Sequence, residues 1–219
     1  MTITIPSSGR LLIALAAGAA LLTAAPAAHA DTVPADTAHA DQCSAAFANG
    51  DARFGPEQLP ASGPLGWQLF GYQRTGGAST SAFLTQYYDS AAGSWRYPPD
   101  NGYLVINGQP LELTQPLLPG QDIDRYGSEY GSFLAPEGSS YASRAIPPSS
   151  LDGNPAAGCN YHDYRVVKSF SVHGGPIAPW FNQPGLGWQY QLDGTLIPGA
   201  PASVNVGWLV TNGYLQRLV

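Results

Sequence analysis

The chain has little charge, and least of all positive charge. Of its 219 residues 11% are charged, Lys and Arg together number 9, and Lys168 is the single lysine. The formal net charge is −6 at pH 7. Nucleic-acid binding needs a basic patch or stripe, and no basic block occurs, so such a partner is not expected. The mild acidic balance indicates a soluble protein and little else.

Several short motifs that identify enzyme classes are missing. The sequence has no G-x-S-x-G elbow, no H-E-x-x-H pair, no P-loop and no G-x-G-x-x-G after an expected strand. These absences argue against the nucleophile-elbow, zinc-peptidase, P-loop and dinucleotide-fold enzymes. An acidic Ca²⁺ loop is missing as well. Candidate functional residues therefore have to be judged one at a time.

Near the N-terminus an apolar run of residues 11–22 follows Arg10 and precedes an A-x-A signal at Ala28 and Ala30. The run is too short for a membrane span and predicts a secretory signal peptide over residues 1–30. A retained membrane anchor is the alternative. We expect cleavage before Asp31, a secreted product that leaves the membrane, and a flexible tail over residues 31–42.

Cysteine is scarce, with Cys43 and Cys159 as its two examples. In an exported chain two cysteines are expected to pair, which would tie the start of the mature chain to its C-terminal half. The entropy of the closed loop makes such a bond worth up to about 4–5 kcal/mol. Two free thiols or a metal pair are the alternatives, although two cysteines without clustered histidines do not make a zinc site.

Glycine and proline, by contrast, are abundant at 26 and 20 residues, so long helices are not expected. The first half predicts a meander of short strands and turns, that is, a β-rich N-terminal extension over residues 43–119. The expected strands are residues 67–72, 83–88, 103–106 and 111–114. Residues 116–120 (PLLPG) predict a joint before a second part.

Residues 120–219 predict strands at residues 164–172, 188–192 and 214–219. Ser203 is expected to cap a short helix that ends at Asn212 and Gly213. The fold class is therefore predicted as α+β and mostly β. It would be a compact twisted antiparallel β core with one or two short helices, preceded by the β-rich extension.

One run, residues 124–133 (DRYGSEYGSF), sets an arginine and two aromatic residues among glycines. Arg125 offers a fork of donors that matches phosphate, the glycines permit a close backbone approach, and Tyr126 and Phe133 offer flat faces. The run thus has two readings. It is a nucleotide-binding turn, or it is a β-hairpin with glycine corners and half-buried aromatic side chains.

Two histidines of the folded part are candidates for acid–base chemistry. His162 could act as a general acid or base, but adjacent strand residues point to opposite faces, so Asp163 cannot easily orient it. His173, beside two glycines, is more typical of a loop. Carboxylates near the glycine-rich run are expected to be solvated unless a pair converges. These are Asp122, Asp124, Glu129 and Glu137.

Gln189 stands in the middle of an aromatic strand, beside Trp188 and Tyr190. If its side chain faces inward, it must be hydrogen-bonded or contact a ligand. The same alternation is also typical of an ordinary half-exposed strand, so spacing leaves both readings open.

Several ordered blocks of the second half carry a resemblance to a known family. They are DRYGSEYGSFLAPEG (124–138), ASRAIPPSSL (142–151), YHDYRVV (161–167), GGPIAPWFNQPGLGWQY (174–190) and NGYLQRL (212–218). This pattern resembles the TNT family, named for the tuberculosis necrotizing toxin, whose relatives include secreted fungal NADases. The resemblance covers about residues 120–219, and the first half is similar more loosely to the thumb-like extension of secreted members.

The resemblance implies an NAD⁺ glycohydrolase that cleaves the nicotinamide–ribose bond of NAD⁺, with some activity on NADP⁺ and no metal or other cofactor. The family's motif arginine falls on Arg125, its following aromatic on Phe133, its second arginine on Arg144 and its glutamine on Gln189. Arg125 and Gln189 are thereby expected to be catalytic. Substrate binding is expected of Tyr126, Phe133, Arg144, His162 and Trp188.

The chemistry of these residues agrees with that implication. Arg125 and Arg144 suit the diphosphate of NAD⁺, and Gln189 could bind the ribose hydroxyls or the attacking water. An immunity protein and a second copy of the chain, as a homodimer, are the candidate protein partners. A non-catalytic binding module is the alternative function, as is an ADP-ribosyl cyclase in which Glu129 would serve as the catalytic carboxylate.

Overall fold

The computed structural model describes residues 41–218 of the chain. The expected signal peptide and residues 31–40 of the expected tail lie outside the described residues. No helix within residues 41–218 has both the length and the apolar character that crossing a membrane requires.

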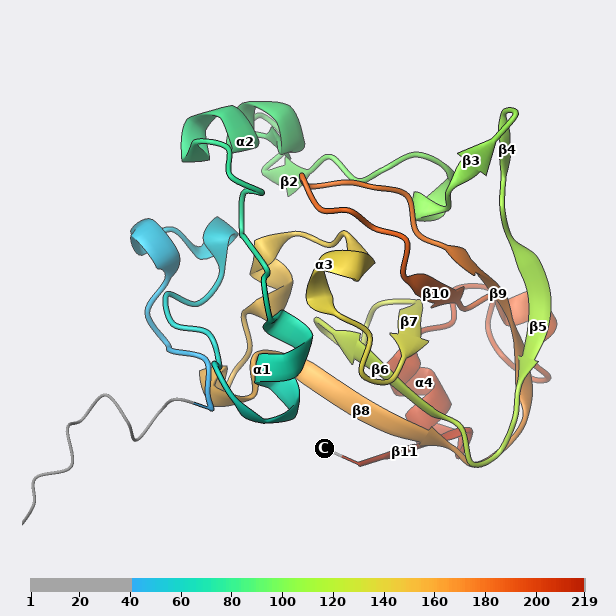
Figure 1. The fold of residues 1–219 in the computed structure, drawn as a ribbon. Helices are drawn as coiled ribbons and strands as arrows, with labels where there is room; N and C mark the ends of the chain where they lie inside the picture. The colour runs from blue at the N-terminus through green and yellow to red at the C-terminus, as the bar shows by residue number, and fades with distance from the viewer. Residues whose placement is uncertain (1–40, 219) are drawn as a thin grey trace, which may run out of the picture. The chain divides into compact units, whose positions relative to one another are not determined.

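An antiparallel sheet of seven strands dominates the described residues (Figure 1), in the order β11-β8-β6-β7-β10-β9-β5. Neighbouring strands of this order all pair antiparallel. The strands are β5 Leu113–Leu117, β6 Asp122–Tyr126, β7 Phe133–Pro136, β8 Tyr161–Val166, β9 Phe170–Pro176, β10 Trp188–Gln191 and β11 Leu215–Arg217. The mostly β fold class that the sequence predicts is confirmed.

Two small hairpins and several short helices complete the part of the chain that the structure describes. The hairpins are β1 Tyr88–Asp89 with β2 Ser94–Trp95 and β3 Val105–Ile106 with β4 Gln109–Pro110. The α-helices are α1 Gly63–Leu69, α2 Thr80–Tyr87, α3 Tyr141–Arg144 and α4 Val206–Thr211. In Figure 1 the β3–β4 hairpin projects beyond the end of β5.

The first half differs from the predicted meander because two expected strands are helices. Residues 67–69 are the last turn of α1, which has a proline in its first turn, and residues 70–71 follow it as a turn. Residues 83–88 fall largely in α2, whose N-cap Ser79 accepts a hydrogen bond from the amide of Ala82. Phe83 and Tyr87 of α2 are both buried, and their spacing of four residues places them on one helical face. The spacing of four residues between buried aromatic side chains therefore distinguishes a helix from a strand here.

Three expectations for the second half need correction. Residues 164–172 are not one strand, because β8 ends at Val166 and β9 begins at Phe170. In the sheet the strands β6, β7 and β10 lie between β8 and β9. The N-cap of α4 is Asn205, whose side chain accepts a hydrogen bond from the amide of Trp208, and not Ser203. His173 lies on β9 rather than in a loop. The strands expected at residues 188–192 and 214–219 are confirmed as β10 and β11.

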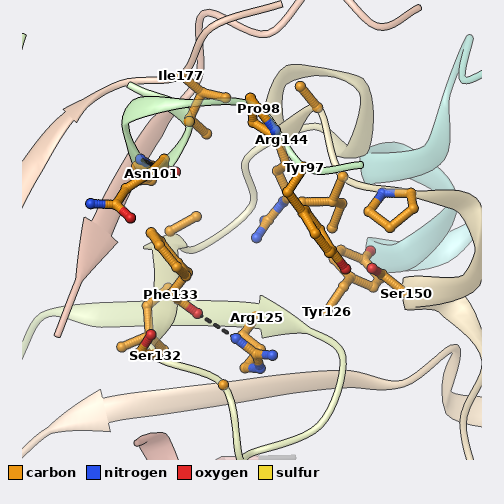
Figure 2. A pocket seen from close by; sticks show the side chains of 18 of the residues that line it. Tyr97, Pro98, Asn101, Arg125, Tyr126, Ser132, Phe133, Arg144, Ser150 and Ile177 are labelled. Carbon is orange, nitrogen blue, oxygen red and sulfur yellow. Dashed lines mark hydrogen bonds between the residues drawn. The ribbon is translucent and has the colours of Figure 1, made fainter. Parts of the chain in front are cut away.

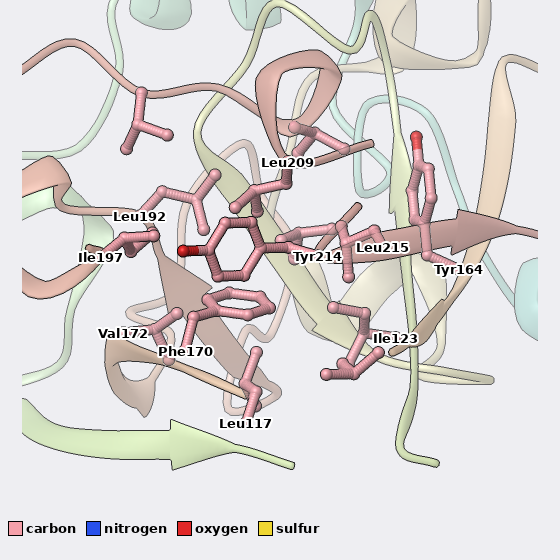
Figure 3. Close-up of a cluster of buried hydrophobic side chains, with 14 residues drawn as sticks. Leu117, Ile123, Tyr164, Phe170, Val172, Leu192, Ile197, Leu209, Tyr214 and Leu215 are labelled. Atoms are coloured by element: carbon pink, nitrogen blue, oxygen red, sulfur yellow. The ribbon is translucent and has the colours of Figure 1, made fainter. Parts of the chain in front are cut away.

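The main core fills one face of the sheet, between its strands and α4 (Figure 3). Its members are buried, mostly apolar side chains from β5 to β11, namely Leu117, Ile123, Leu134, Tyr164, Val166, Phe170, Val172, Leu192, Ile197, Val204, Val206, Leu209, Tyr214 and Leu215. Tyr214 and Leu215 lead from α4 into β11, so burial of this cluster fixes the last strand on the sheet. Full burial of each large side chain of this cluster contributes about 1.5–3 kcal/mol to stability.

A second cluster covers the opposite face, and it is where the disulfide lies. Cys43 and Cys159 are bonded, with 5.2 Å between their Cα atoms, so the predicted pairing is confirmed. The two cysteines belong to one buried cluster with Leu69 of α1, Tyr126 of β6 and Tyr141 of α3. The N-terminal segment is therefore held against the face of the sheet that carries Tyr126.

A third cluster is aromatic and joins α2 to the segment that follows β9. Phe83 and Tyr87 of α2 pack against Phe54 and Phe181, and the rings of Tyr87 and Phe181 lie 5.2 Å apart. Together with β5, which pairs with β9, this cluster connects the first half to the second. Residues 41–218 all fall within one compact unit. The domain boundary expected near Gly120 stays a prediction.

Candidate active site

A pocket of about 450 Å³ lies where the sheet meets the N-terminal extension. Its walls come from the segment Tyr97 to Gly102, from β6, β7 and β10, and from α3 and the residues that follow it. Figure 2 shows Phe133, Tyr97 and Tyr126 around this space, with Arg144 reaching in from α3. The elements that form the pocket thus come from both halves of the chain.

Strand alternation decides which side chains of β7 and β10 face this pocket. On β7 Leu134 packs into the main core, so Phe133 and Ala135 face the other way. On β10 Gln191 is paired with Phe133, and Gln189 shares its face. Phe133 and Gln189, the predicted nicotinamide wall and the predicted catalytic glutamine, are therefore brought together on one surface.

Arg144, at the end of α3, is buried in an ion pair with Asp124 of β6. Its Nη1 and Nη2 donate to the two carboxylate oxygens of Asp124 at 2.6 and 2.8 Å, and the two side chains are 5% and 0% exposed. Nε and Nη2 also donate to the carbonyl of Ser139. Asp124 accepts further bonds from the hydroxyl of Tyr161 and the amide of Gly138. Arg144 reaches the pocket with its charge compensated.

Tyr126, next to Asp124 on β6, supports this ion pair. The guanidinium of Arg144 lies 5.2 Å from the centre of the Tyr126 ring, a cation–π arrangement. The Tyr126 hydroxyl donates to Gln68 of α1. Burial raises the pKa of Tyr126 well above its usual range, so its phenol is neutral at any physiological pH. Tyr126 thus lines the pocket as a neutral aromatic wall.

Arg125 lies in the glycine-rich hairpin and has no carboxylate partner among the ion pairs of residues 41–218. Its Nε donates to the carbonyl of Gly127 at 3.1 Å, and its Nη1 donates to the carbonyl of Phe133 at 2.7 Å (Figure 2). A Cβ on Gly131 would stand 2.1 Å from Nη2, so a larger residue there would displace the guanidinium. Burial lowers the pKa of Arg125, but an arginine remains charged.

The loop between β6 and β7 is fixed from its outer side by Glu129. The carboxylate accepts bonds from Arg217 at 2.7 and 2.5 Å and from the hydroxyl of Tyr164 at 2.8 Å. These bonds, with that from Arg217 the largest, hold the pKa of Glu129 below its usual value. Glu129 is absent from the lining of the described pocket. The loop therefore has the predicted hairpin geometry, and it still presents a charged arginine.

Gln189 is buried, with 8% of its surface exposed. Its Nε2 donates to the carbonyl oxygen of Asn101 at 3.0 Å, 88 residues away in the sequence. Gly102, beside Asn101, lies close to the same amide: its ideal Cβ would be 3.8 Å from Oε1. The side chain of Gln189 therefore faces inward and is hydrogen-bonded, as one of the two readings of the sequence predicted.

The extension contributes residues that the sequence did not single out. Tyr97, Pro98, Asn101 and Gly102 line the pocket, and all lie before the second half. Tyr97 is 63% exposed at the mouth of the pocket. The sequence marked Asn101 and Gly102 as a turn, but nothing local indicated that this turn meets a strand so distant in the chain.

His162 and Trp188 do not line the pocket described above. His162 stands opposite Arg125 in the β6–β8 register, and its Nε2 lies 3.4 Å from the side-chain oxygen of Asn160. Burial lowers the pKa of His162, so the ring is neutral near pH 7. Trp188 adjoins Gln189 and therefore points to the other face of β10. Their substrate-binding roles stay predictions.

Within residues 41–218, no three His, Cys, Asp or Glu side chains lie close enough together to hold a metal ion. The expectation that the chemistry needs no cofactor stays a prediction.

Comparison with known proteins places this chain in a family. The family model described as tuberculosis necrotizing toxin (TNT) matches residues 116–218. A conidial surface nicotinamide adenine dinucleotide glycohydrolase of Aspergillus fumigatus is 43% identical over 175 residues, which cover 77% of this chain and 70% of that protein. The tuberculosis necrotizing toxin solved with its immunity factor has a TM-score of 0.49 and 20% identity, covering 64% of this chain and 71% of the toxin chain.

The match to the fungal protein is longer than the match to the family model and therefore extends into the first half of the chain. The chain belongs to the TNT family of NAD glycohydrolases.

Proposed function

We propose that this chain is a secreted NAD⁺ glycohydrolase that converts NAD⁺ to ADP-ribose and nicotinamide. One observation carries the proposal: Gln189 and Phe133 share one face of a pocket beside Arg125 and Arg144. Membership of a family of NAD glycohydrolases supports it. Since NAD⁺ is the substrate, the reaction as proposed needs no further cofactor.

The proposed reaction breaks the bond between C1′ of the ribose and the pyridinium nitrogen. The bonding electrons pass to that nitrogen, which becomes neutral, so the leaving group needs no acid. A water oxygen then bonds to C1′ and releases a proton to solvent. The enzyme has to bind the dinucleotide, stabilise the developing ribosyl cation and place the water.

Gln189 is the residue that we assign to the cation and the water. Its Nε2 is engaged by Asn101, so Oε1 is the end available to accept a bond from a ribose hydroxyl or from the water. A fixed amide oxygen also presents partial negative charge where positive charge develops. The ring of Phe133, on the same face, would stack on the nicotinamide, with Tyr126 as a further aromatic wall.

The two arginines would treat the diphosphate differently. Arg125 lacks a carboxylate partner among residues 41–218, and the carbonyls of Gly127 and Phe133 offset its charge only in part. Arg144 is compensated by Asp124 and would offer the diphosphate a hydrogen-bond donor more than a net charge. We therefore assign most of the attraction for the anionic substrate to Arg125 and retain Arg144 as a binding residue.

The remaining partners and the location are part of the proposal. NAD⁺ is the proposed substrate, and NADP⁺ is included as a second one. Release to the cell exterior is proposed from the expected signal peptide, and a relative is described as a conidial surface protein. A toxin or antagonist role follows because loss of NAD⁺ kills a cell. An immunity protein and a homodimer stay predictions.

The test is release of nicotinamide from NAD⁺ by the purified mature chain, with identification of the second product. ADP-ribose is expected; a cyclic product or no release would contradict the proposal. The variant Gln189→Ala is expected to fold like the parent and to lose about 10²–10³ in kcat, the usual effect of removing one preorganised group. Turnover by Gln189→Ala at the parent rate would overturn the role of Gln189.

A further inference from the structure

The backbone of Asn101, in the extension, accepts a hydrogen bond from the side chain of Gln189. Gln189 Nε2 donates to the Asn101 carbonyl oxygen at 3.0 Å. A carbonyl oxygen only accepts hydrogen bonds, so the amide nitrogen of Gln189 has to face it. The opposite flip would set two acceptors against each other. The bond to Asn101 therefore fixes which end of the Gln189 amide is the nitrogen and which is the oxygen.

An unusual turn presents that carbonyl. Asp100, Asn101 and Gly102 have φ angles of 51°, 52° and 80°, three successive residues in the left-handed region. Such φ values are costly for most residues and are tolerated best by glycine, asparagine and aspartate. The sequence Asp-Asn-Gly at this place is thus matched to the conformation, and a β-branched residue at Asn101 would resist it.

The turn is attached to the second half at several points, so its position is defined. The carbonyl of Gly102 accepts a bond from the amide of Ala178 at 2.8 Å. The amide of Leu104 donates to the carbonyl of Pro176, also at 2.8 Å. A Cβ on Gly102 would lie 3.3 Å from Cγ of Pro98, closer than most carbon contacts. A change of backbone angle at Asn101 would therefore move the carbonyl relative to Gln189 without freeing the rest of the turn.

We propose that Asn101 is a positioning residue for the proposed reaction: its left-handed backbone holds the Gln189 amide with Oε1 toward the substrate. The proposal rests on the proposed NAD⁺ glycohydrolase function and on Gln189 as the residue that acts on the ribosyl cation. Asn101 precedes residue 116, where the match to the family's domain begins. The N-terminal extension is then a part of the catalytic apparatus and not only a covering layer.

The geometry separates a positioning role from a substrate contact. The side chain of Asn101 is exposed, and the bond to Gln189 uses its backbone oxygen. Replacement by glycine keeps both the carbonyl and the left-handed angles while it removes the side chain. Replacement by valine keeps the carbonyl but opposes the angles. The pair Asn101→Gly and Asn101→Val thus tests the backbone conformation alone.

The experiment is steady-state hydrolysis of NAD⁺ by the full mature chain. Asn101→Val is expected to lower kcat by about 10- to 100-fold, the scale of a misplacement near 1 Å, and to change KM by less than about twofold. Asn101→Gly, which keeps the left-handed angles, is expected to lose at least about fivefold less kcat than Asn101→Val does. An equal loss in both variants would identify the side chain as a substrate contact and overturn the proposal.

Asn107 supplies a matched control. It has a φ of 52°, precedes Gly108 in the turn of the β3–β4 hairpin, and is exposed. It does not line the pocket described. Asn107→Val therefore imposes the same kind of backbone strain away from Gln189. Parent-like kcat in Asn107→Val, with comparable melting temperatures of the two valine variants, supports the proposal; equal losses of kcat would overturn it.

A double-variant cycle makes the result specific. If Asn101 acts through Gln189, adding Asn101→Val to Gln189→Ala lowers the residual kcat by no more than about twofold. Full additivity of the two effects would overturn the proposal, as would an Asn101→Val enzyme with parent kcat. A parent enzyme that releases no nicotinamide would instead contradict the proposed function, so the two failures are distinguishable.

Discussion

Two arginines border the same pocket and are supported in opposite ways. Arg144 is buried in a bidentate ion pair with Asp124, and Tyr161 and Gly138 complete the bonding of that carboxylate. Arg125 has no carboxylate partner among the described ion pairs and gives two of its donors to backbone carbonyls of its own hairpin. A carboxylate compensates the positive charge of Arg144, and none of the described ion pairs compensates that of Arg125.

Residue type alone therefore does not assign a role to either arginine. A buried charge needs a partner, and removing that partner leaves an expensive unpaired ion. A charge bonded only to neutral carbonyls still attracts an anion, because carbonyl dipoles offset it in part. We therefore expect Arg144 to matter first for stability and Arg125 first for activity.

The largest expected effect is on stability, in Arg144→Met. This change leaves the fully buried carboxylate of Asp124 without its cation and should lower the free energy of unfolding by about 3–5 kcal/mol. Urea unfolding followed by tryptophan fluorescence measures it. The double variant Asp124→Leu with Arg144→Met, in which neither charge remains, should recover much of the loss.

Arg165 offers the matched control for this prediction. It pairs with Asp122 at 2.6 Å, the same distance as in the Arg144 pair, but its side chain is 49% exposed. Arg165→Met should cost less than about 1 kcal/mol because water screens the pair. If Arg144→Met were no more costly than Arg165→Met, the contrast between buried and exposed pairs would not hold here.

The next effect is on activity and uses Gly131. Its φ is outside the left-handed region, but a Cβ would stand 2.1 Å from Nη2 of Arg125 and 2.5 Å from Cζ. Gly131→Ala should therefore displace the guanidinium and lower kcat/KM for NAD⁺ by about 10²-fold, with a stability loss near 1 kcal/mol from the disturbed hydrogen bonds.

Gly158→Ala is the control for Gly131→Ala, since nothing lies within 4 Å of its ideal Cβ and its φ is also outside the left-handed region. It should retain parent kcat/KM. Arg125→Lys tests the same point chemically, because lysine keeps the charge and loses the planar fork. Parent-like kcat/KM in both Gly131→Ala and Arg125→Lys would show that the charge of Arg125 is not used.

Much of this arrangement was predictable from local pattern. A hairpin was one of the two readings of the glycine-rich run, and β6 and β7 do pair, with Ile123 opposite Pro136. Alternation around Gln189 allowed an inward side chain, and the structure has it buried. The two cysteines were expected to bond and do so. In each case the prediction depended on residues close together in the sequence, or on a residue type, such as cysteine, that has few structural roles.

What the sequence could not provide is which distant faces meet. Asp124 was treated as one of several solvated acids, yet it is the buried partner of Arg144, 20 residues later. Asn101 reaches Gln189 across 88 residues, and no local signal encodes that contact. α1 and α2 were missed because short aromatic runs fit both a strand and a helix, and only burial on one side decides between them.

The smallest effect concerns the excess of acidic groups around the Arg144 pair. Asp163 of β8 lies opposite Asp124, is 9% exposed, and has an Oδ1 without a hydrogen-bond partner among the described atoms. Burial, followed by the charges of Glu137, Asp124 and Asp122, raises the pKa of Asp163 to about 6, from a usual value of 3.8. Arg165 is the nearby cation, and it is paired with Asp122.

The sign of the pH dependence follows from this raised pKa. Between pH 4 and pH 6 the native state holds the proton of Asp163 more tightly than the unfolded chain does, so stability falls as pH rises and levels off above that range. Asp163→Asn carries no charge and should remove this fall, gaining up to about 2 kcal/mol above pH 6 and little at pH 4. Urea midpoints from pH 4 to 8 measure the difference, with exposed Glu112→Gln as the control. An unchanged slope in Asp163→Asn would mean that Asp163 is ionised at no cost, and that the Arg144 pair compensates more than one carboxylate.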